Sequence, residues 1–359
     1  MATFLITDSD NGITNNNFHY LLGFQPSLGG IAIRKESIHI FLDSRYYAKT
    51  KKINKDLITE KTKISDIYFH KVSGPLVDIM LLTCKSSKNI ELEENLTLKY
   101  FHEINNKSDL GTSGDPKKTS VIPNYFEKNR LVKSDPEIKK MKKAIEVIDK
   151  VSMFIQYLVD THEIYGKTES EVRNIIVNKI LEFGGEDESF EAIVAFGVHS
   201  SVPHHTAGDT IIEDGPLLID MGAKYKGYCS DFTRTFWVGK KTDDYDEFQK
   251  VYRSVKKASI KATLGARVGM KASQIDALAR KSIIKDGYGE YFSHSTGHGV
   301  GLNIHEGPWI TKMSHDVIKT GMMFTIEPGI YLPGKFGIRI ENIVVAKEER
   351  VKCVSKIRY

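Results

Sequence analysis

Residues 217–238 read LLIDMGAKYKGYCSDFTRTFWV, and this stretch decides how the second half of the chain is organised. Apolar runs surround Asp220 and Asp231, and the segment KYKG between them can turn, so we expect a β-hairpin. With the turn centred between Tyr225 and Lys226, the two aspartates fall opposite each other, about 5 Å apart at their Cβ atoms. Two aspartates beside a turn are usually surface residues. Here the apolar flanks place them inside, where unpaired carboxylates are costly and a cation between them would remove their repulsion.

Three later stretches add further candidate ligands. They are FSHSTGHGVGLNIHEGP with His298, FTIEPGIY with Glu327, and GIRIENIVV with Glu341. Each such residue alone would more often be structural, but two Asp, two Glu and one His together suit Mn, Co or Zn, and four carboxylates are enough for two ions. A structural zinc site would use cysteines instead. Arg339 lies two residues before Glu341, so on a strand the two share a face and Arg339 can orient a ligand carboxylate.

Composition excludes several other classes. The 359 residues include 51 Lys and Arg against 46 Asp and Glu, a balance too even to indicate nucleic-acid binding. The cysteines Cys84, Cys229 and Cys353 lie far apart without C-x-x-C spacing, which favours a reducing compartment, and we expect the cytoplasm. The N-terminus lacks the pattern of a signal peptide, and no window approaches about 18 uninterrupted apolar residues, so we expect no membrane span.

The length suggests about two domains, and the sequence pattern changes near residue 128. Before that point, IAIRKESIHIFLD (31–43) has the pattern of a hairpin, and NNKSDLGTSGDPKKTS (105–120) has that of an exposed loop. After it, helical stretches alternate with apolar blocks typical of antiparallel strands, so we expect an α+β fold. The expected helices begin at Ser134 or Asp135 and at Thr168, and two more run over 243–264 and 271–285.

On these motifs the chain resembles the pita-bread metallopeptidases, and most closely the branch of Xaa-Pro aminopeptidases (aminopeptidase P) and Xaa-Pro dipeptidases (prolidases). The resemblance implies a pita-bread catalytic domain over residues 128–359, preceded by a smaller creatinase-type α/β domain over residues 1–127. NNFHYLLGF and FLDSRYYAKTK resemble that N-terminal domain more loosely. The strings that carry the catalytic resemblance are PHH, IDMGAKYKGYCSDFTRTF, HSTGHGVGLNIHE, TIEPGIY and GIRIEN.

The resemblance also implies a role for each residue. Two divalent ions are expected, most simply Mn²⁺, with Co²⁺ or Zn²⁺ as alternatives, and Asp231 and Glu341 would bridge them. Glu327 would also accept a proton, and Arg339 would orient a ligand carboxylate. The implied metal ligands are Asp220, Asp231, His298, Glu327 and Glu341.

Several histidines would face the substrate. The resemblance makes His294 and His305 substrate and transition-state residues, with His305 a proton shuttle, and it places His204 in the substrate pocket. The adjacent His205 leaves the last assignment open, because the spacing to Asp220 is one residue shorter than usual. His199 stands where the family often has Asn. Candidates for the wall around a proline ring are Phe190, Tyr228 and Trp309, although plain packing is the commoner role.

The implied reaction is release of the N-terminal residue from peptides with proline second, by hydroxide held between two metal ions. The main alternative is a dipeptidase, which has to capture the free carboxylate of proline, usually with an added Arg. EGPWITK follows His305 and contains no Arg, so the sequence favours the aminopeptidase. A catalytically inactive binding module is disfavoured because all five ligands are present. We expect peptide substrates, no nucleic-acid or membrane partner and, by analogy with the family, a homodimer.

Overall fold

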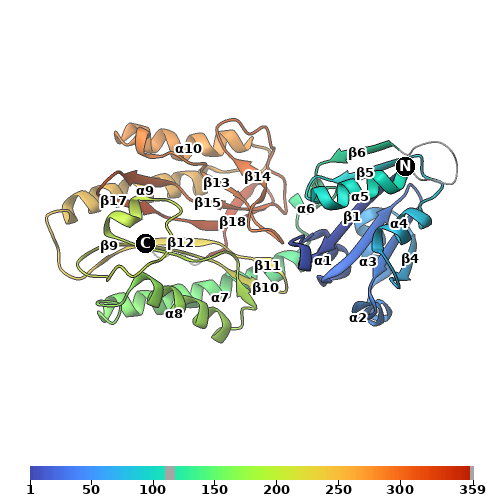
Figure 1. Ribbon diagram of the computed structural model, residues 1–359. Helices are drawn as coiled ribbons and strands as arrows, with labels where there is room; N and C mark the ends of the chain where they lie inside the picture. Colours follow the sequence, from blue (N-terminus) through green and yellow to red (C-terminus); the bar gives the residue numbers. More distant parts are fainter. Residues whose placement is uncertain (110–117, 356–359) are drawn as a thin grey trace. The chain divides into compact units, whose positions relative to one another are not determined.

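A computed structural model of the protein describes residues 1–109 and 118–355. The chain divides into two compact units, Met1–Asn129 and Arg130–Tyr359, and each mixes helices with strands (Figure 1). The expected boundary lies two residues earlier, after residue 127. Within the described residues, no helix is long and apolar enough to cross a membrane.

The first unit is built on a six-stranded mixed sheet in the order β4-β3-β2-β1-β5-β6. The hairpin expected at residues 31–43 is confirmed, since β2 and β3 pair antiparallel, whereas β4, β5 and β6 join the sheet in parallel. The strands are β1 (Ala2–Asp8), β2 (Leu28–Ile33), β3 (Ser37–Leu42), β4 (Asp66–Lys71), β5 (Asn89–Glu93) and β6 (Lys118–Ile122). The helices are α1 (Asn17–Leu22), α2 (Ser44–Tyr47), α3 (Lys55–Thr62), α4 (Leu76–Thr83) and α5 (Leu98–Asp109).

The loop expected at residues 105–120 is wrong at both ends, and its centre, residues 110–117, lies outside the described residues. Residues 105–109 continue α5, which is anchored by the buried Tyr100 and Ile104, and residues 118–120 belong to β6. The hydroxyl of Thr119 donates to Asn105 at 2.7 Å, so strand and helix are tied together. The polar composition predicted a loop because composition alone does not reveal the two buried side chains, one helical turn apart, that hold α5 in place.

The second unit contains the long capped helices that the sequence predicts. Glu137 accepts a hydrogen bond from the backbone N–H of Ser134 at 2.8 Å, and Thr168 and Glu171 bond reciprocally at the start of the next helix. The helices are α6 (Glu127–Leu131), which crosses the unit boundary, α7 (Asp135–Asp160), α8 (Glu169–Glu182), α9 (Tyr245–Gly265) and α10 (Ala272–Lys285).

The strands that the structure describes in this unit form four small sheets, in the orders β12-β9-β8, β14-β13-β15-β18-β19, β11-β10-β7 and β16-β17. Their pairings are antiparallel, as expected. The strands are β7 (Asp187–Glu188), β8 (Ile193–Phe196), β9 (Gly215–Met221), β10 (Ala223–Tyr225), β11 (Tyr228–Cys229), β12 (Phe232–Val238), β13 (Gly297–Gly299), β14 (Glu306–Ile310), β15 (Met323–Ile326), β16 (Gly329–Leu332), β17 (Phe336–Arg339), β18 (Asn342–Lys347) and β19 (Arg350–Cys353).

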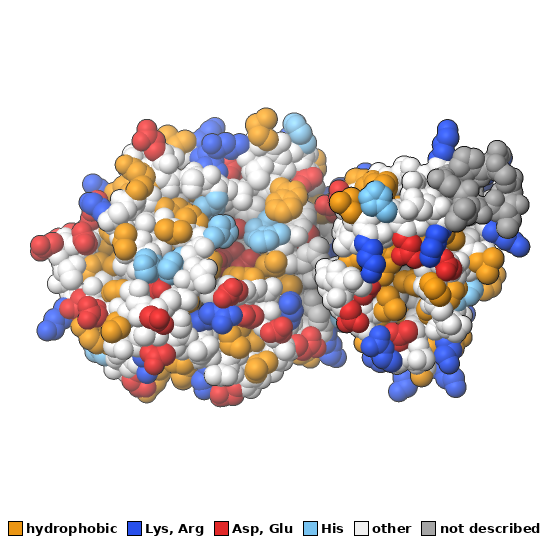
Figure 2. All heavy atoms as spheres, in the orientation of Figure 1, with side chains coloured by type: hydrophobic (Ala, Val, Ile, Leu, Met, Phe, Trp, Pro, Cys, Tyr) orange, Lys and Arg blue, Asp and Glu red, His pale blue; other side chains and the backbone are white. Residues whose placement is uncertain are grey.

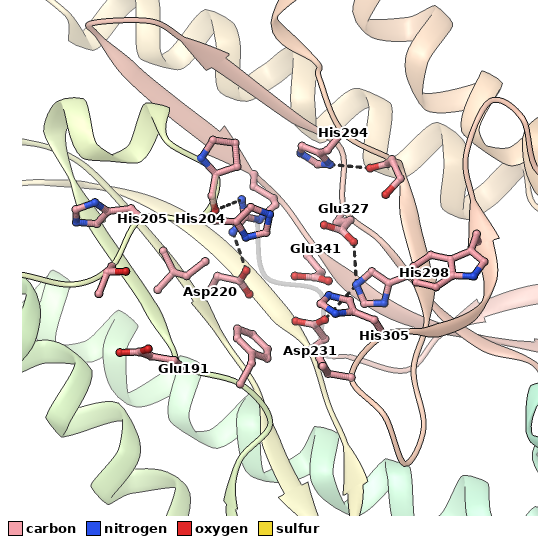
Figure 3. Close-up of a pocket in the computed structure, with 18 residues that line it drawn as sticks. Glu191, His204, His205, Asp220, Asp231, His294, His298, His305, Glu327 and Glu341 are labelled. Carbon is pink, nitrogen blue, oxygen red and sulfur yellow. Dashed lines mark hydrogen bonds and ion pairs between the residues drawn. The ribbon is translucent and has the colours of Figure 1, made fainter. Parts of the chain in front are cut away.

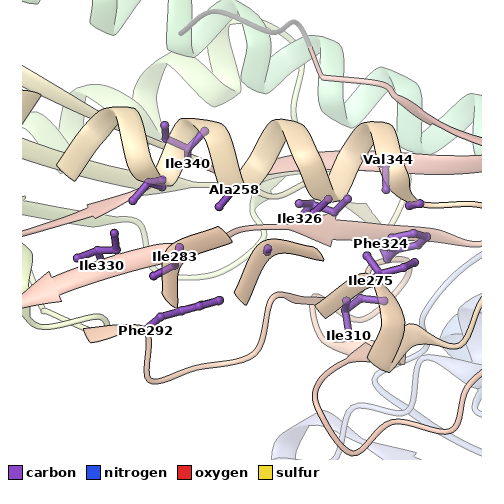
Figure 4. Close-up of a cluster of buried hydrophobic side chains, with 14 of the residues drawn as sticks. Ala258, Ile275, Ile283, Phe292, Ile310, Phe324, Ile326, Ile330, Ile340 and Val344 are labelled. Carbon is purple, nitrogen blue, oxygen red and sulfur yellow. The ribbon is translucent and has the colours of Figure 1, made fainter. Parts of the chain in front are cut away.

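Two pairs of helices cover these strands from opposite sides (Figure 1). Helices α9 and α10 pack Ala258 and Ile275 against Phe324, Ile326 and Val344 of β15 and β18 in one apolar cluster (Figure 4). Helices α7 and α8 pack against β8, β9 and β12 in a second cluster. The candidate ligands lie at the ends of the strands between the two helix layers.

Candidate metal centre

The five candidate ligands come from separate strands and converge on one cavity of about 570 Å³. Asp220 belongs to β9, Asp231 lies just before β12, and His298 belongs to β13. Glu327 directly follows β15, and Glu341 lies between β17 and β18. Figure 3 shows their side chains pointing toward one another, and Figure 2 shows histidines gathered around acidic side chains on this face of the unit. The predicted residues His204, His294, His305 and Arg339 line the same cavity.

The hairpin that carries the two aspartates differs in register from the prediction. Lys226 and Gly227 form a two-residue turn with φ of 48° and 76°, so the hairpin is centred between them. Such a turn needs positive φ at both positions, and Gly227 adopts it without steric cost. Asp220 therefore pairs with Thr233 rather than with Asp231. Asp231 lies two residues from Thr233, so the two carboxylates are diagonal neighbours on one face.

One oxygen of each of three ligand carboxylates is held by the protein. Asp220 Oδ2 accepts from Arg339 Nη2 at 2.7 Å, and Glu341 Oε2 accepts from the Thr233 hydroxyl at 2.6 Å. Glu327 Oε1 accepts from the Thr325 hydroxyl at 2.9 Å. The hydroxyl of Thr233 also accepts from Arg339 Nε at 3.0 Å, which links the supports of Asp220 and Glu341. Arg339 thus contacts the carboxylate of a candidate ligand, and its role in orienting that carboxylate stays a prediction.

The remaining oxygens provide a test of whether a cation fits. Asp220 Oδ1 and Glu341 Oε1 are buried and accept no hydrogen bond from the described residues. Buried acceptors are almost always satisfied, so two such oxygens aimed into one cavity are what a metal centre requires. Asp231, His298 and Glu341 each offer a ligand atom within 4.8 Å of the others. The donor set fits divalent ions.

The electrostatics of the cavity agree with this interpretation. Burial, followed by the charges of Glu341, Asp220 and Glu327, raises the pKa of Asp231 well above its usual value. Burial and the charges of Glu327 and Asp220 likewise raise the pKa of Glu341. So many buried acidic groups cannot all be ionised side by side unless positive charge joins them. Divalent ions would supply that charge.

His298 is held in the form that a metal ligand needs. Burial lowers its pKa, which favours the neutral ring. Its Nδ1 lies 3.1 Å from the carbonyl oxygen of Gly299, and a carbonyl only accepts, so Nδ1 carries the proton. Nε2 then presents its lone pair, 3.5 Å from Asp231 Oδ2 and 3.3 Å from Glu327 Oε1. This is the arrangement usual for a ligating histidine.

His294 is oriented by a chain of hydrogen bonds that includes a residue missed by the sequence analysis, Tyr331. Burial lowers the pKa of His294, and its Nδ1 donates to the carbonyl of Ser295 at 2.7 Å. In the neutral ring Nε2 is then an acceptor, so the hydroxyl of Tyr331 donates to it at 2.9 Å. The same hydroxyl accepts from Arg339 Nη1 at 2.7 Å. Tyr331 lies in the TIEPGIY motif, which was the available signal.

His305 faces the candidate metal ligands, and the residue that follows it belongs to a buried ion-pair cluster. Its ring lies 4.4 Å from that of His298, and partial burial and the nearby His298 lower its pKa. The next residue, Glu306, is buried and accepts from Arg130 and from Lys133, both at 2.7 Å. No local sequence pattern indicated this ion-pair cluster.

The two adjacent histidines point to different places. His204 lies in the cavity near Asp220, whereas His205 lies farther from the candidate metal ligands (Figure 3). His205 lines the edge of the cavity but bonds through Nε2 to Glu169 at 2.8 Å. Of the aromatic candidates, Phe190 and Trp309 line the cavity; Tyr228 is buried and donates to Glu137 at 2.9 Å, so it packs elsewhere.

Comparison with known proteins agrees with the fold. The model of metallopeptidase family M24 matches residues 139–348, and the chain belongs to this family. The chain is 34% identical to the Xaa-Pro dipeptidase of Pyrococcus horikoshii over 345 residues, which cover 95% of this chain and 91% of the relative.

Solved structures give the same result. A Xaa-Pro dipeptidase from Bacillus anthracis has a TM-score of 0.86 and 31% identity, and covers 99% of this chain and 93% of that chain. An X-Pro aminopeptidase from Thermotoga maritima has a TM-score of 0.83 and 32% identity, and covers 99% of this chain and 96% of that chain. The predicted family branch and the fold, a pita-bread domain after an N-terminal domain, are confirmed.

Proposed function

We propose that this protein is a metal-dependent Xaa-Pro dipeptidase, which hydrolyses the bond before proline. The observation that carries the proposal is the convergence of four carboxylates and one neutral histidine on a single cavity, with two buried carboxylate oxygens left for a cation. The dipeptide preference rests on the relatives named Xaa-Pro dipeptidase that match along the whole chain. It reverses the preference for an aminopeptidase that the sequence suggested.

The same five residues would hold two divalent ions, and Mn²⁺ suits their oxygen-rich set. Bound ions of this kind supply a nucleophile at neutral pH by lowering the pKa of water, and they polarise the scissile carbonyl. Arg339 and Thr233 keep the ligand carboxylates oriented through the hydrogen bonds described above. The ligands are Asp220, Asp231, His298, Glu327 and Glu341.

The protein's own groups would move the proton and position the substrate. Glu327 accepts a proton during attack, since its carboxylate lines the cavity beside the other candidate ligands. His305, whose ring is exposed to the cavity, passes a proton to the leaving prolyl nitrogen. An Xaa-Pro bond offers no N–H, so the proline ring is recognised by shape. Phe190, Ile304 and Trp309 supply apolar wall for the ring.

A Xaa-Pro aminopeptidase remains the second candidate, and one observation favours it. Among the described residues that line the cavity, Arg339 is the only arginine, and its guanidinium is bound to Asp220. A free proline carboxylate would thus lack an unengaged arginine, whereas a longer peptide has no carboxylate at that position. The cytoplasmic location and the homodimer expected from the sequence also remain proposals.

The test compares an Xaa-Pro dipeptide with the matching Xaa-Pro-Yaa tripeptide, each with and without Mn²⁺. Faster, Mn²⁺-dependent cleavage of the dipeptide is expected, and preference for the tripeptide would establish the aminopeptidase instead. The variant Asp231→Asn keeps the side-chain volume and removes one of the five candidate metal ligands, so it should be folded by circular dichroism and inactive on both peptides. Wild-type protein that cleaves neither peptide, whatever metal is added, would point back to an inactive binding module.

A further inference from the structure

A second cluster of metal-ligating side chains lies beside the catalytic cavity. Glu169 is the first residue of α8, and its side chain is 0% exposed. His199 lies in the short helix Gly197–Ser201, and His205 follows a few residues later. His199 Nδ1 lies 2.9 Å from Glu169 Oε1, and His205 Nε2 lies 2.8 Å from Glu169 Oε2. The two imidazole rings stack with centroids 4.3 Å apart and planes 27° from parallel.

These three side chains present one ligand atom each within 4.8 Å of one another. Zinc binds His nitrogen and carboxylate oxygen at about 2.0–2.2 Å, which places tetrahedral ligand atoms roughly 3.3 Å apart. The nitrogen-to-oxygen distances here are shorter than that by only about half an ångström. Small side-chain rotations are therefore enough to admit an ion between the rings and the carboxylate.

The carboxylate is fixed in place independently of the histidines. The backbone N–H of Phe196 donates to Oε1 at 2.8 Å, and that of Gly208 donates to Oε2 at 3.1 Å. Backbone bonds from Glu169 to Thr210 and from Ser170 to Gly208 dock the same loop on the helix. The loop thus stays folded around Glu169 while the imidazoles exchange one partner for another.

The cluster is also open to solvent. The side chains of His199 and His205 are 36% and 16% exposed, so an ion can reach a carboxylate that is itself buried. Because a carboxylate only accepts, each imidazole now presents an N–H to it. On binding, each proton would move to the other ring nitrogen, and the freed lone pair would bind the ion. Each neutral imidazole keeps one proton, so the exchange is balanced without an added acid or base.

We propose that Glu169, His199 and His205 form a binding site for one divalent transition-metal ion of the Zn²⁺ class, separate from the catalytic pair. Two imidazoles and one carboxylate favour Zn²⁺ or Co²⁺ over Mg²⁺, Ca²⁺ and Mn²⁺. The site does not depend on the proposed peptidase reaction, because none of its three residues is a candidate catalytic ligand. Its occupancy would stiffen the segment that carries His204 into the catalytic cavity.

The experiment counts metal. Full-length protein is dialysed to equilibrium against buffered free Zn²⁺, and bound Zn²⁺ per chain is measured by elemental analysis. The test variant is His199→Gln/His205→Gln, since glutamine can still donate a hydrogen bond to Glu169 but is a poor zinc ligand. The control is His315→Gln, which changes an exposed histidine outside both clusters. The test pair is also compared in an Asp231→Asn background, where the catalytic centre is impaired.

The test variant should bind one Zn²⁺ fewer than wild type and the control, and the same difference of one should persist in the Asp231→Asn background. Equal counts in wild type and the test variant would overturn the proposal and leave the cluster as a hydrogen-bonded loop anchor. Crystals of Zn²⁺-treated wild-type protein give a readout that needs no variant. An anomalous peak between Glu169 and the two imidazoles is expected, and its absence at saturating Zn²⁺ would likewise refute the site.

Discussion

Removing the carboxylate of Glu306 is expected to destabilise the second unit strongly. The Glu306, Lys133 and Arg130 side chains are 8%, 2% and 5% exposed, and Glu306 binds each cation at 2.7 Å. Breaking a buried ion pair costs about 3–5 kcal/mol, because it leaves a charge that water cannot solvate. In Glu306→Ala, Lys133 and Arg130 each lose one charged partner inside the protein, so we expect a loss of about 3–5 kcal/mol in unfolding free energy.

Tryptophan fluorescence in a urea titration measures this loss for the correct unit. The chain has 2 tryptophans, Trp237 and Trp309, and both belong to the second unit. The matched control Glu290→Ala removes an exposed carboxylate and should change the free energy by about 0.5 kcal/mol or less. A Glu306→Ala loss of under about 1 kcal/mol would show that the cluster is solvated in solution and would refute the reasoning.

The same cluster predicts a pH dependence. Burial raises the pKa of Glu306, but the charges of Lys133 and Arg130 outweigh it and hold the pKa below the usual value of 4.5. A group with a lowered folded pKa stabilises the protein above its unfolded pKa, and this contribution is lost as the pH falls through the folded value. Wild type should therefore lose more unfolding free energy than Glu306→Gln when acidified below about pH 4.5.

Two further predictions concern the cavity. Tyr331→Phe removes the hydroxyl that accepts from Arg339 and donates to His294, so kcat/KM on Xaa-Pro substrates should fall about 10–100-fold, corresponding to about 1.4–2.8 kcal/mol. The control is Tyr291→Phe, which changes an exposed tyrosine. Equal kcat/KM values for Tyr331→Phe and wild type would contradict the proposed orientation of His294. The metal-free protein should lose stability as the pH rises, because Asp231 and Glu341 have raised pKa values and the native state binds more protons than the unfolded chain. This pH dependence of stability is measured by the urea midpoints of unfolding at about pH 5 and about pH 8, with chelator and with Mn²⁺. If the chelated protein is as stable at the higher pH as at the lower, these carboxylates are not close together.

Features that depend only on residues close together in the chain were predicted correctly from the sequence. Helix starts at Ser134 and Thr168 depend on residues three positions apart, and these helices are confirmed. The candidate ligands were identifiable because each lies in or next to an apolar strand, so that residue type and burial could be inferred together. The hairpin register was missed because it depends on which two residues adopt positive φ, and KYKG allows more than one centre.

Long-range partners could not be predicted in the same way. Lys133 and Glu306 are 173 positions apart, and Tyr331 and His294 are 37 apart, so no local pattern relates them. From the sequence, His205 was only an alternative to its neighbour His204. In the structure its hydrogen-bond partner is Glu169, at the start of α8. Such contacts depend on the tertiary arrangement of the strands.

The position of Glu341 has a consequence for how the protein matures in the cell. Its carboxylate bonds to Thr233, its backbone carbonyl accepts from Arg234 at 2.7 Å, and it is the last of the five ligands along the chain. During synthesis the hairpin with Asp220 and Asp231 leaves the ribosome long before β17 and β18. With the proposed ligand set, the centre would be complete only after the C-terminal strands are released, so the ions around the finished protein rather than the nascent chain would decide which metal it binds.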